Sequence, residues 1–539
     1  MHFSVLALTI ALYASGACSV PSQKINVQPT VTISSGLVAG IATSLPPSER
    51  VVHKFLGIPF GKPPVRFKPP QPAAPWQSVY DASTYRPACL QQFNYPEEKR
   101  NQSIKWFNTP GPPAGESEDC LNLNVFSPAS ASEGSKAVLF WIHGGSFRFG
   151  SGSLPLYDGS SFAANQDVVV VTVNYRTNVF GFPGSPELPV GERNLGLLDQ
   201  RLALDWVHRN IAPFGGNPEK VTIVGESAGG GSVDALVGAP PDPIPFRAAI
   251  MQSGESSVRL LVSDPAASWK KLAEATACPS DIALECLRFF PASKIKDISE
   301  RLQLEFGPVP DGGLTYADTP RTNRLNSAKN ASLIARVPVL IGSNADEGRP
   351  TVLGQNDTEA YLRASLPGLP EAAIKKILDA YPLGTPGIAN EFERLATILT
   401  ELVILCPASL ITQESAVVGI DTWRFYFNAS FPNTELFEGS GAYHTAEINL
   451  VFGTYPQTGK TKFQVDVSNG MQEAWARFVK DPNNGLPWQK VPQLGVFGGG
   501  ARASMDEKGK KVLSAIDSQL VDRRCALYQE LYRLKSGGV

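Results

Sequence analysis

The sequence has no marked excess of charge of either sign. Its 539 residues include 48 Lys or Arg and 50 Asp or Glu, which gives a formal net charge of −2. Because proteins attract nucleic acids and anionic membranes mainly through clustered positive charge, we expect neither as a partner. With 42% hydrophobic residues, a chain of this length can bury a large core. We therefore expect a soluble globular protein that acts on neutral or weakly charged molecules.

Metal-binding patterns are lacking as well. No two cysteines have C-x-x-C spacing, and the only histidine in the C-terminal half, His444, lies far along the chain from any cysteine. We expect no metal and no cofactor. Internal repeats, charge blocks and low-complexity tracts are also absent from the sequence.

Lysine and arginine are missing from the first residues, "MHFSVLALTIALYASGACSV". The apolar run from Phe3 to Tyr13 and the small residues after it predict a secretory signal peptide over residues 1–19, cleaved after Ala17 or Ser19. An uncleaved anchor is the alternative, but the run is short for a membrane span. No later run is long and apolar enough to cross a bilayer, and the C-terminal "LKSGGV" is neither a retention signal nor a lipid-anchor tail. We expect a secreted, extracellular protein with no stable membrane anchor.

The cysteines and sequons agree with export. Beyond Cys18 at the signal boundary, six cysteines remain, which allow three disulfides in any of about fifteen connectivities: Cys89, Cys120, Cys278, Cys286, Cys406 and Cys525. N-glycosylation sequons, whose occupancy the sequence leaves open, occur at four positions: Asn101, Asn330, Asn356 and Asn428.

Short apolar runs recur along the chain and predict an α/β fold. They are "AVLFWI" (137–142), "VVVVTV" (168–173), "VTIV" (221–224), "AAIM" (248–251), "VPVLI" (337–341) and "WRFYF" (423–427). Uninterrupted β-branched runs separated by helix-like stretches, such as "LLDQRLALDWVHRNI", are typical of parallel strands buried on both faces. We expect one α/β layer domain over residues 20–539, with a helical excursion from about 255 to 335.

A candidate nucleophile follows one of these strands. After "VTIV" comes G-E-S-A-G, which matches the G-x-S-x-G nucleophile elbow, a turn so sharp that larger side chains at Gly225 and Gly229 would collide. The elbow would expose Ser227 at the start of a helix, beyond the carboxyl end of the strand, where ligands bind in parallel sheets. An ordinary Gly-rich strand–helix turn is the alternative.

A serine nucleophile needs a base, and elbow hydrolases place their partners in the order Ser, acid, His. The five histidines are His2, His53, His143, His208 and His444. Only His444 follows Ser227, so it is the candidate base. "VPVLIGSNADEG" supplies the acid after a strand, but local reasoning does not choose between Asp346 and Glu347.

Acyl transfer also needs hydrogen-bond donors for the developing oxyanion. "AVLFWIHGGSF" ends a predicted strand with Gly144, Gly145 and Ser146, whose backbone N–H groups can face the site. The N–H of Ala228, directly after the nucleophile, is the other candidate donor. A plain Gly-Gly turn is the alternative for the first segment.

The sequence resembles the type-B carboxylesterase/lipase family, which is the cholinesterase-like group, and more narrowly the secreted fungal-type esterases of that family. The resemblance covers residues 28–535. It is carried by "FGGNPEKVTIVGESAG" (214–229), by "NLGLLDQRLALDWVHRNIAPFGG", and by "EDCLNLNVFSP" (118–128), where Asn122 replaces the usual Tyr or Thr. It implies the α/β-hydrolase fold, with a large, mostly parallel central sheet and helices on both faces.

Carried over by position, the resemblance implies a role for each candidate. Ser227 is the nucleophile, Glu347 rather than Asp346 the acid, and His444 the base, with the oxyanion held by the N–H groups of Gly145, Ser146 and Ala228. Ser146 stands where the family has a third Gly, so its side chain can narrow the pocket or add a polar contact. Glu226, Ser253 and Glu447 match polar positions that orient the triad. Cys89 pairs with Cys120, Cys278 with Cys286, and Cys406 with Cys525.

The resemblance also bears on the substrate. In this family the loop closed by the first disulfide is a lid in lipases and carries a choline-binding Trp in cholinesterases. Here it contains Phe93, Tyr95, Trp106 and Phe107. Trp106 lies farther from the second cysteine than a choline-binding Trp would, which disfavours choline esters. The loop either shelters a hydrophobic substrate or packs down onto the protein.

We therefore expect a serine hydrolase that cleaves small-molecule or lipid carboxylic esters by two-step acyl transfer. A triacylglycerol lipase is the alternative within this class, and amide hydrolysis uses the same machinery. A non-catalytic cholinesterase-like recognition protein is the alternative from another class, but it would predict a damaged triad. The natural ester and the oligomeric state are not given by the sequence.

Overall fold

The computed structural model describes residues 28–45, 50–258, 264–366, 369–503 and 507–535. The predicted signal peptide, residues 1–19, lies outside them. Four of the six strands expected from the sequence begin within one residue of the expected position, and the other two are β9, which begins five residues earlier, and β11, which begins two later.

Eleven strands form the central sheet, in the order β14-β13-β12-β11-β10-β9-β7-β8-β6-β4-β3. From β8 to β13 neighbouring strands pair in parallel, and the pairs outside this block are antiparallel. The bounds are β3 Ile41–Ser44, β4 Val51–Pro59, β6 Asn122–Pro128, β7 Lys136–Ile142, β8 Val169–Val173, β9 Gly216–Glu226, β10 Ala248–Gln252, β11 Val339–Asn344, β12 Thr422–Ala429, β13 Gln493–Ala501 and β14 Leu513–Asp517. A separate three-stranded sheet contains β1 Thr30–Ile33, β2 Gly36–Ala39 and β5 Tyr80–Asp81.

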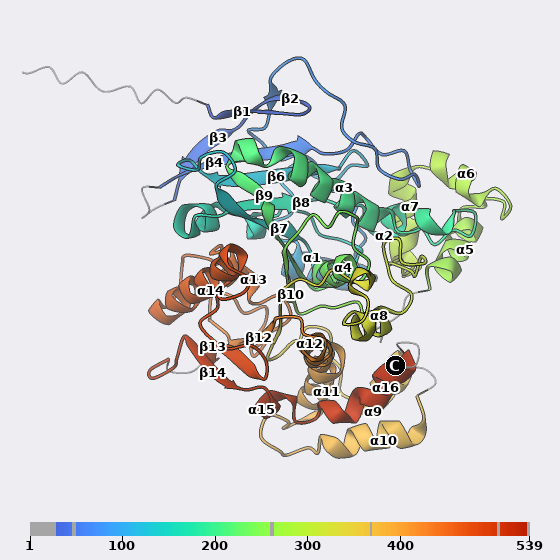
Figure 1. Ribbon diagram of the computed structural model, residues 1–539. Helices are drawn as coiled ribbons and strands as arrows, with labels where there is room; N and C mark the ends of the chain where they lie inside the picture. The colour runs from blue at the N-terminus through green and yellow to red at the C-terminus, as the bar shows by residue number, and fades with distance from the viewer. Residues whose placement is uncertain (1–27, 46–49, 259–263, 367–368, 504–506, 536–539) are drawn as a thin grey trace, which may run out of the picture.

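Helices connect the parallel strands and lie around the sheet (Figure 1). Between residues 264 and 335 the structure has helices and no strand, as the sequence predicts for this excursion. The bounds are α1 Glu97–Phe107, α2 Asn178–Gly181, α3 Leu195–Asn210, α4 Ala228–Gly238, α5 Pro265–Ala275, α6 Ala283–Phe289, α7 Ala292–Arg301, α8 Pro320–Asn326, α9 Thr358–Ser365, α10 Glu371–Ala380, α11 Glu391–Leu399, α12 Cys406–Val417, α13 Ile448–Val451, α14 Lys462–Lys480, α15 Gln519–Asp522 and α16 Gln529–Lys535.

Side chains that alternate along β7 enter two different cores. Phe140 and Ile142 pack in a core that includes α3, α4 and α12, whereas Leu139 and Trp141 pack in a core that includes α13 and α14. Because successive residues of a strand point to opposite faces of its sheet, the helices cover both faces. This is the mostly parallel α/β-hydrolase architecture that the resemblance implies. Every residue of β7 after Lys136 is buried.

One expectation about apolar runs is wrong. The helix Glu391–Val417, made of α11, a π-helical turn and α12, is long and apolar enough to span a bilayer by length and composition. However, 72% of its most apolar window is buried inside the protein. Its hydropathy is that of a core helix, which must be apolar on several sides because it packs against the sheet and against other helices.

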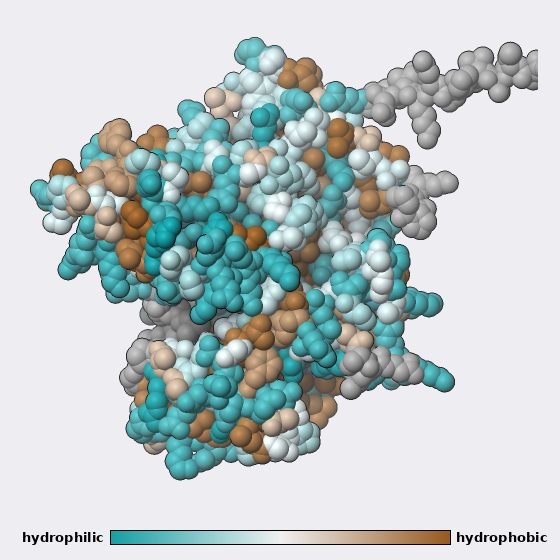
Figure 2. Space-filling view, turned by 180° about the vertical axis from the view of Figure 1, so that it is seen from behind, coloured by the Kyte–Doolittle hydropathy of each residue, from teal (hydrophilic) through white to brown (hydrophobic). Residues whose placement is uncertain are grey.

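Three disulfides join Cys89 to Cys120, Cys278 to Cys286 and Cys406 to Cys525, the pairing that the resemblance implies. Among the sequon asparagines, Asn101, Asn330 and Asn356 are exposed, and Asn428 is half-buried on β12. On the face seen in Figure 2, hydrophobic residues are interspersed among hydrophilic ones.

Candidate active site

Ser227 occupies the sharp turn between β9 and α4. Its backbone has φ 55° and ψ −123°, a conformation that only a tightly packed turn sustains for a residue with a Cβ. The crowding expected at the flanking glycines is present: a Cβ on Gly225 would lie 2.3 Å from the carbonyl oxygen of Gly229, and one on Gly229 would lie 2.0 Å from that of Ile142. The N–H of Ser227 donates to the carbonyl of Gln252 at 2.9 Å, which fixes the turn against β10.

The loop after β7 lies against this turn. A Cβ on Gly144 would be 3.0 Å from the Cβ of Ser227, so only glycine permits this approach. Gly145 and Ser146 follow with φ of 105° and 55°, and neither backbone N–H donates to another described residue. Ala228 is the first residue of α4, where an amide has no acceptor within its own helix. Three amides near the serine are thus available as donors.

His444 is brought to the end of β11 by a carboxylate. Nδ1 of His444 donates to Oε2 of Glu347 at 2.7 Å, across 97 positions of sequence. The other carboxylate oxygen of Glu347 accepts the backbone N–H of Asn344 at 2.6 Å, and the residue is only 3% exposed. Between the two adjacent acids that the sequence left open, the one in contact with the imidazole is therefore Glu347.

The other nitrogen of this imidazole faces a second carboxylate. Nε2 of His444 lies 3.3 Å from Oε1 of Glu226, the residue before the serine. Burial lowers the pKa of His444, but the charge of Glu226 and the hydrogen bond and charge of Glu347 outweigh burial and raise it to about 10. Burial in turn raises the pKa of Glu226 well above its ordinary value. Oε1 of Glu226 has no hydrogen-bond partner among the described residues, so the two side chains interact through charge, and their titrations are coupled.

The hydroxyl of Ser227 has no hydrogen bond to another described residue, and the side chain is half-buried at the elbow. Its imidazole partner faces Glu226, the adjacent residue, rather than the hydroxyl itself. Hydrogen bonds of this kind are often long or poorly aligned until substrate is bound. The elbow and the imidazole therefore lie close together. We expect Nε2 of His444 to come within hydrogen-bond distance of the Ser227 hydroxyl when substrate binds.

Of the two remaining predicted polar residues, Glu447 is joined to the site and Ser253 is not. Glu447 accepts from Asn344 Nδ2 at 2.6 Å and from Gln252 Nε2 at 2.9 Å, so it links β10 to the residue that holds Glu347. The hydroxyl of Ser253 is buried with no hydrogen-bond partner among the described residues. Sequence reasoning missed Asn344 and Gln252, because amides directly before a turn carry no distinctive local pattern.

Sequence reasoning also gave no role to His143, which supports the loop of donors. Its ring stacks on Tyr175 at 4.4 Å between centroids, and its Nδ1 lies 2.9 Å from the carbonyl oxygen of Gly144. The ring is fully buried, and burial lowers its pKa to about 4. A neutral imidazole therefore packs against Gly144 and Gly150. A Cβ on Gly150 would lie 2.4 Å from the His143 ring, so the contact requires glycine at this position.

The aromatic side chains of the loop between Cys89 and Cys120 pack onto the rest of the protein. The ring of Trp106 lies 5.6 Å from that of Phe437, and the rings of Phe93 and Phe107 lie 5.2 and 6.5 Å from that of Phe149. Phe437 belongs to the segment that leads to His444, so α1, which lies within the disulfide loop, contacts that segment.

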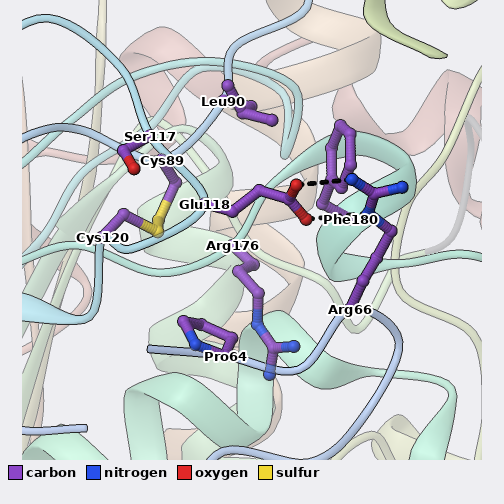
Figure 3. Close-up of a pocket in the computed structure, with 9 residues that line it drawn as sticks. All are labelled: Pro64, Arg66, Cys89, Leu90, Ser117, Glu118, Cys120, Arg176 and Phe180. Carbon is purple, nitrogen blue, oxygen red and sulfur yellow. Dashed lines mark hydrogen bonds and ion pairs between the residues drawn. A yellow bond between two sulfur atoms is a disulfide. The ribbon is translucent and has the colours of Figure 1, made fainter. Parts of the chain in front are cut away.

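The base of the same loop is anchored by charge (Figure 3). Arg66 donates to both carboxylate oxygens of Glu118, at 2.8 and 2.5 Å, beside the disulfide and over the ring of Phe180. Its guanidinium also donates to the carbonyl oxygens of Leu287 and Phe290. Such bidentate pairing fixes orientation as well as position.

No group of three or more His, Cys, Asp or Glu side chains within the described ranges has the arrangement of a metal site. The chemistry that the assembled groups can perform is attack by a hydroxyl on a carbonyl, with an imidazole as base and backbone amides as oxyanion donors.

Comparisons with known proteins identify the family to which this fold belongs. The family model described as "Carboxylesterase family" matches residues 27–497. The chain is 34% identical over 462 residues to the para-nitrobenzyl esterase of Bacillus subtilis (strain 168), covering 81% of this chain and 88% of that protein. It is 33% identical over 495 residues to carboxylesterase 1C of Rattus norvegicus (86% and 88%), and 32% identical over 488 residues to the cholinesterase of Mus musculus (84% and 78%). The narrower resemblance to fungal-type members stays a prediction.

Proposed function

This chain belongs to the carboxylesterase family and is a carboxylic ester hydrolase; we propose that it cleaves its esters through a Ser227–His444–Glu347 triad and an acyl-enzyme intermediate. The observation that carries the proposal is the 2.7 Å hydrogen bond from His444 Nδ1 to Glu347, which leaves Nε2 directed toward the elbow. Such a carboxylate holds the imidazole in the tautomer that can accept a proton at Nε2.

The proposed reaction has two halves. Oγ of Ser227 attacks the ester carbonyl while Nε2 of His444 takes its proton, and the N–H groups of Gly145, Ser146 and Ala228 donate to the resulting oxyanion. When the tetrahedral intermediate collapses, the C–O bond to the alcohol breaks and His444 returns its proton to the leaving oxygen. Water then attacks the acyl-enzyme with the same proton transfers, which releases the acid and restores the serine.

The ordinary substrates that we propose are soluble esters of neutral alcohols. The chain has a net charge of −2, and the rings of its disulfide loop are engaged with Phe149 and Phe437 rather than free to meet a lipid surface. A triacylglycerol lipase is the second candidate, favoured by the aromatic character of that loop. Activity confined to esters below their solubility limit would exclude it, and a rise in activity above that limit would support it.

The triad is tested with a short p-nitrophenyl ester and three variants. Ser227→Ala and His444→Ala should each lower kcat by about 10⁶-fold, and Glu347→Gln by about 10⁴-fold, because the groups act as one unit. Glu438→Gln is the matched control, since Glu438 is exposed on the segment that leads to His444. Unchanged turnover in Ser227→Ala, with the protein folded, would refute the proposal. The non-catalytic alternative would be favoured only if the parent protein were also inactive.

We also propose that the protein is secreted as one domain spanning residues 20–539. The three disulfides support this, because such bonds form and persist in oxidising compartments. N-terminal sequencing of the protein recovered from culture medium should begin at residue 18 or 20. Peptide mass analysis with and without glycosidase would establish the occupancy of Asn101, Asn330, Asn356 and Asn428.

A further inference from the structure

Two chain segments are fastened together beside the candidate triad. One comprises the last residue of β11 and the turn after it, residues 344–349, and the other is the segment 439–443 that leads to His444. The side-chain amide of Asn344 donates to the carbonyl of Tyr443 at 2.9 Å. Asp346 makes two bonds to Ala442: its backbone N–H donates to the Ala442 carbonyl at 2.9 Å, and its Oδ2 accepts the Ala442 N–H at 2.9 Å.

Arg349 extends this contact by one further bond. Its Nη1 donates to the carbonyl of Gly439 at 2.7 Å, while its Nε donates to Oδ1 of Asp346 at 3.1 Å. A second guanidinium, that of Arg502, lies 3.5 Å from Oδ2 of the same carboxylate. Both oxygens of Asp346 are therefore engaged, and two positive charges offset its negative charge at a side chain that is 15% exposed.

The fit between the segments is close enough to require glycine. Gly441 has φ 67°, and a Cβ there would lie 2.4 Å from Oδ2 of Asp346. The carboxylate thus packs directly onto the backbone of the segment, and even a methyl group at position 441 would displace it. This close approach restrains the path of the chain shortly before the histidine.

We propose that Asp346, together with Arg349, is a positioning residue that fixes the backbone leading to His444 and thereby the place of its imidazole opposite Ser227. The inference rests on the proposed triad. Glu347 restrains the ring at Nδ1, but a single bond to a ring nitrogen leaves the backbone free to shift. Asn344 holds the carbonyl of Tyr443, and Asp346 adds a restraint at both backbone groups of Ala442. The two adjacent carboxylates therefore act differently, since Glu347 orients the ring and Asp346 holds its backbone.

The test compares Asp346→Ala with Asp346→Asn and with the exposed control Asp379→Ala, whose ion pair with Lys375 lies on α10. Displacements of about 1 Å in a catalytic group can cost on the order of 100-fold in rate. We therefore expect Asp346→Ala to lower kcat roughly 10- to 100-fold with KM changed less than about 3-fold. Asp346→Asn keeps an acceptor for the Ala442 N–H but loses the charge opposite Arg349, and should lie between Asp346→Ala and the parent protein.

A readout specific to positioning is the pH dependence of kcat/KM. The carboxylates that face His444, namely Glu226, Glu347 and Glu447, raise its pKa. The acid limb of the profile is the fall in kcat/KM at low pH, where the base becomes protonated. If the imidazole moves away from these carboxylates, its pKa falls and this limb shifts to lower pH. A purely structural role for Asp346 would lower thermal stability but leave that limb in place, and this result would overturn the inference.

Arg349 provides a second arm if Asp346→Ala fails to fold. Arg349→Ala should shift the same limb, and Arg349→Lys should restore part of the parent profile because an ammonium can still reach one carbonyl. The parent and Ser227→Ala are measured first. Loss of activity in Ser227→Ala with parental behaviour in both Asp346 and Arg349 variants would overturn this inference alone, whereas full activity in Ser227→Ala would overturn the triad proposal on which it rests.

Discussion

Nε2 of His444 lies 3.3 Å from Oε1 of Glu226, so the imidazole has a carboxylate at each of its nitrogens. The second carboxylate comes from the residue directly before the candidate nucleophile. The charge of Glu226 is a main cause of the raised pKa of His444, acting against burial. Ionisation of the two side chains is therefore coupled.

Glu226→Gln tests this coupling. A base must be unprotonated to accept the serine proton, so activity falls as the pH drops through the pKa of the base. Removal of the Glu226 charge lowers the pKa of His444, and the acid limb of kcat/KM should move to lower pH. Glu473→Gln, at an exposed site on α14, is the control. An acid limb at the parental pH would show that Glu226 carries no charge when His444 acts as a base.

Six of the seven parallel strands could be predicted from sequence because burial on both faces favours unbroken β-branched and apolar runs, as in Val169–Val173. The seventh, β13, could not, because Gly498, Gly499 and Gly500 interrupt its apolar run. The small sheet could not, since β5 has only two residues and β1 is mostly exposed or half-buried. The apolar helix Glu391–Val417 was missed because acidic residues such as Glu401 and Glu414 interrupt its sequence, although both are buried in the structure.

Within the site, chain order alone brought Ser227 and His444 together as candidates. The role of Asp346 could not be predicted, because its partner Ala442 is 96 positions away and offers only its backbone N–H and carbonyl. The same applies to His143, whose Nδ1 contacts the carbonyl oxygen of Gly144 and whose own carbonyl accepts the hydroxyl of Tyr175. Contacts to backbone atoms leave no trace in the identity of the partner residue.

Ser146→Gly tests whether residue 146 stabilises the oxyanion through its backbone N–H or through its side chain. The left-handed conformation costs a non-glycine residue about 1–2 kcal/mol, and glycine adds about 0.5–1 kcal/mol of unfolded-state entropy, so the free energy of unfolding should stay equal or rise by about 1 kcal/mol. The backbone N–H is retained, and kcat should change less than about 3-fold, against the 100- to 1000-fold expected for a lost donor. Ser146→Val, a β-branched residue at φ 55°, should be destabilised and slower. A 100-fold loss in Ser146→Gly would instead assign the donor role to the hydroxyl.

The disulfides should differ in their contribution to stability. The Cys406–Cys525 bond closes 119 positions and the Cys278–Cys286 bond closes 8. Loop-closure entropy then gives about 5 kcal/mol for the first and about 2.5 kcal/mol for the second. In urea, the Cys406→Ala/Cys525→Ala protein should lose about twice as much unfolding free energy as Cys278→Ala/Cys286→Ala. Equal losses of unfolding free energy would show that the two disulfides do not stabilise the protein mainly by restricting the unfolded chain.

The contact between Trp106 and Phe437 should control the opening of the disulfide loop. Their rings lie 5.6 Å apart and join α1 to the segment that leads to His444. Aromatic pairs of this kind are coupled by about 0.5–1.5 kcal/mol, which corresponds to a change of about 2- to 10-fold in the population of the open loop.

Limited trypsin digestion measures that population, because Arg100 and Lys105 lie on α1 beside Trp106. Trp106→Ala and Phe437→Ala should each speed cleavage at these sites by about 2- to 10-fold, and the double variant should be no faster than the faster single one. The Trp76–Tyr80 pair, with rings 5.0 Å apart in a similar tilted arrangement, provides the control: Trp76→Ala should leave cleavage on α1 unchanged. Additive effects in the double variant would mean that each ring acts through other neighbours, and α1 would then be held by the Phe107 and Phe149 contact rather than by the histidine-bearing segment.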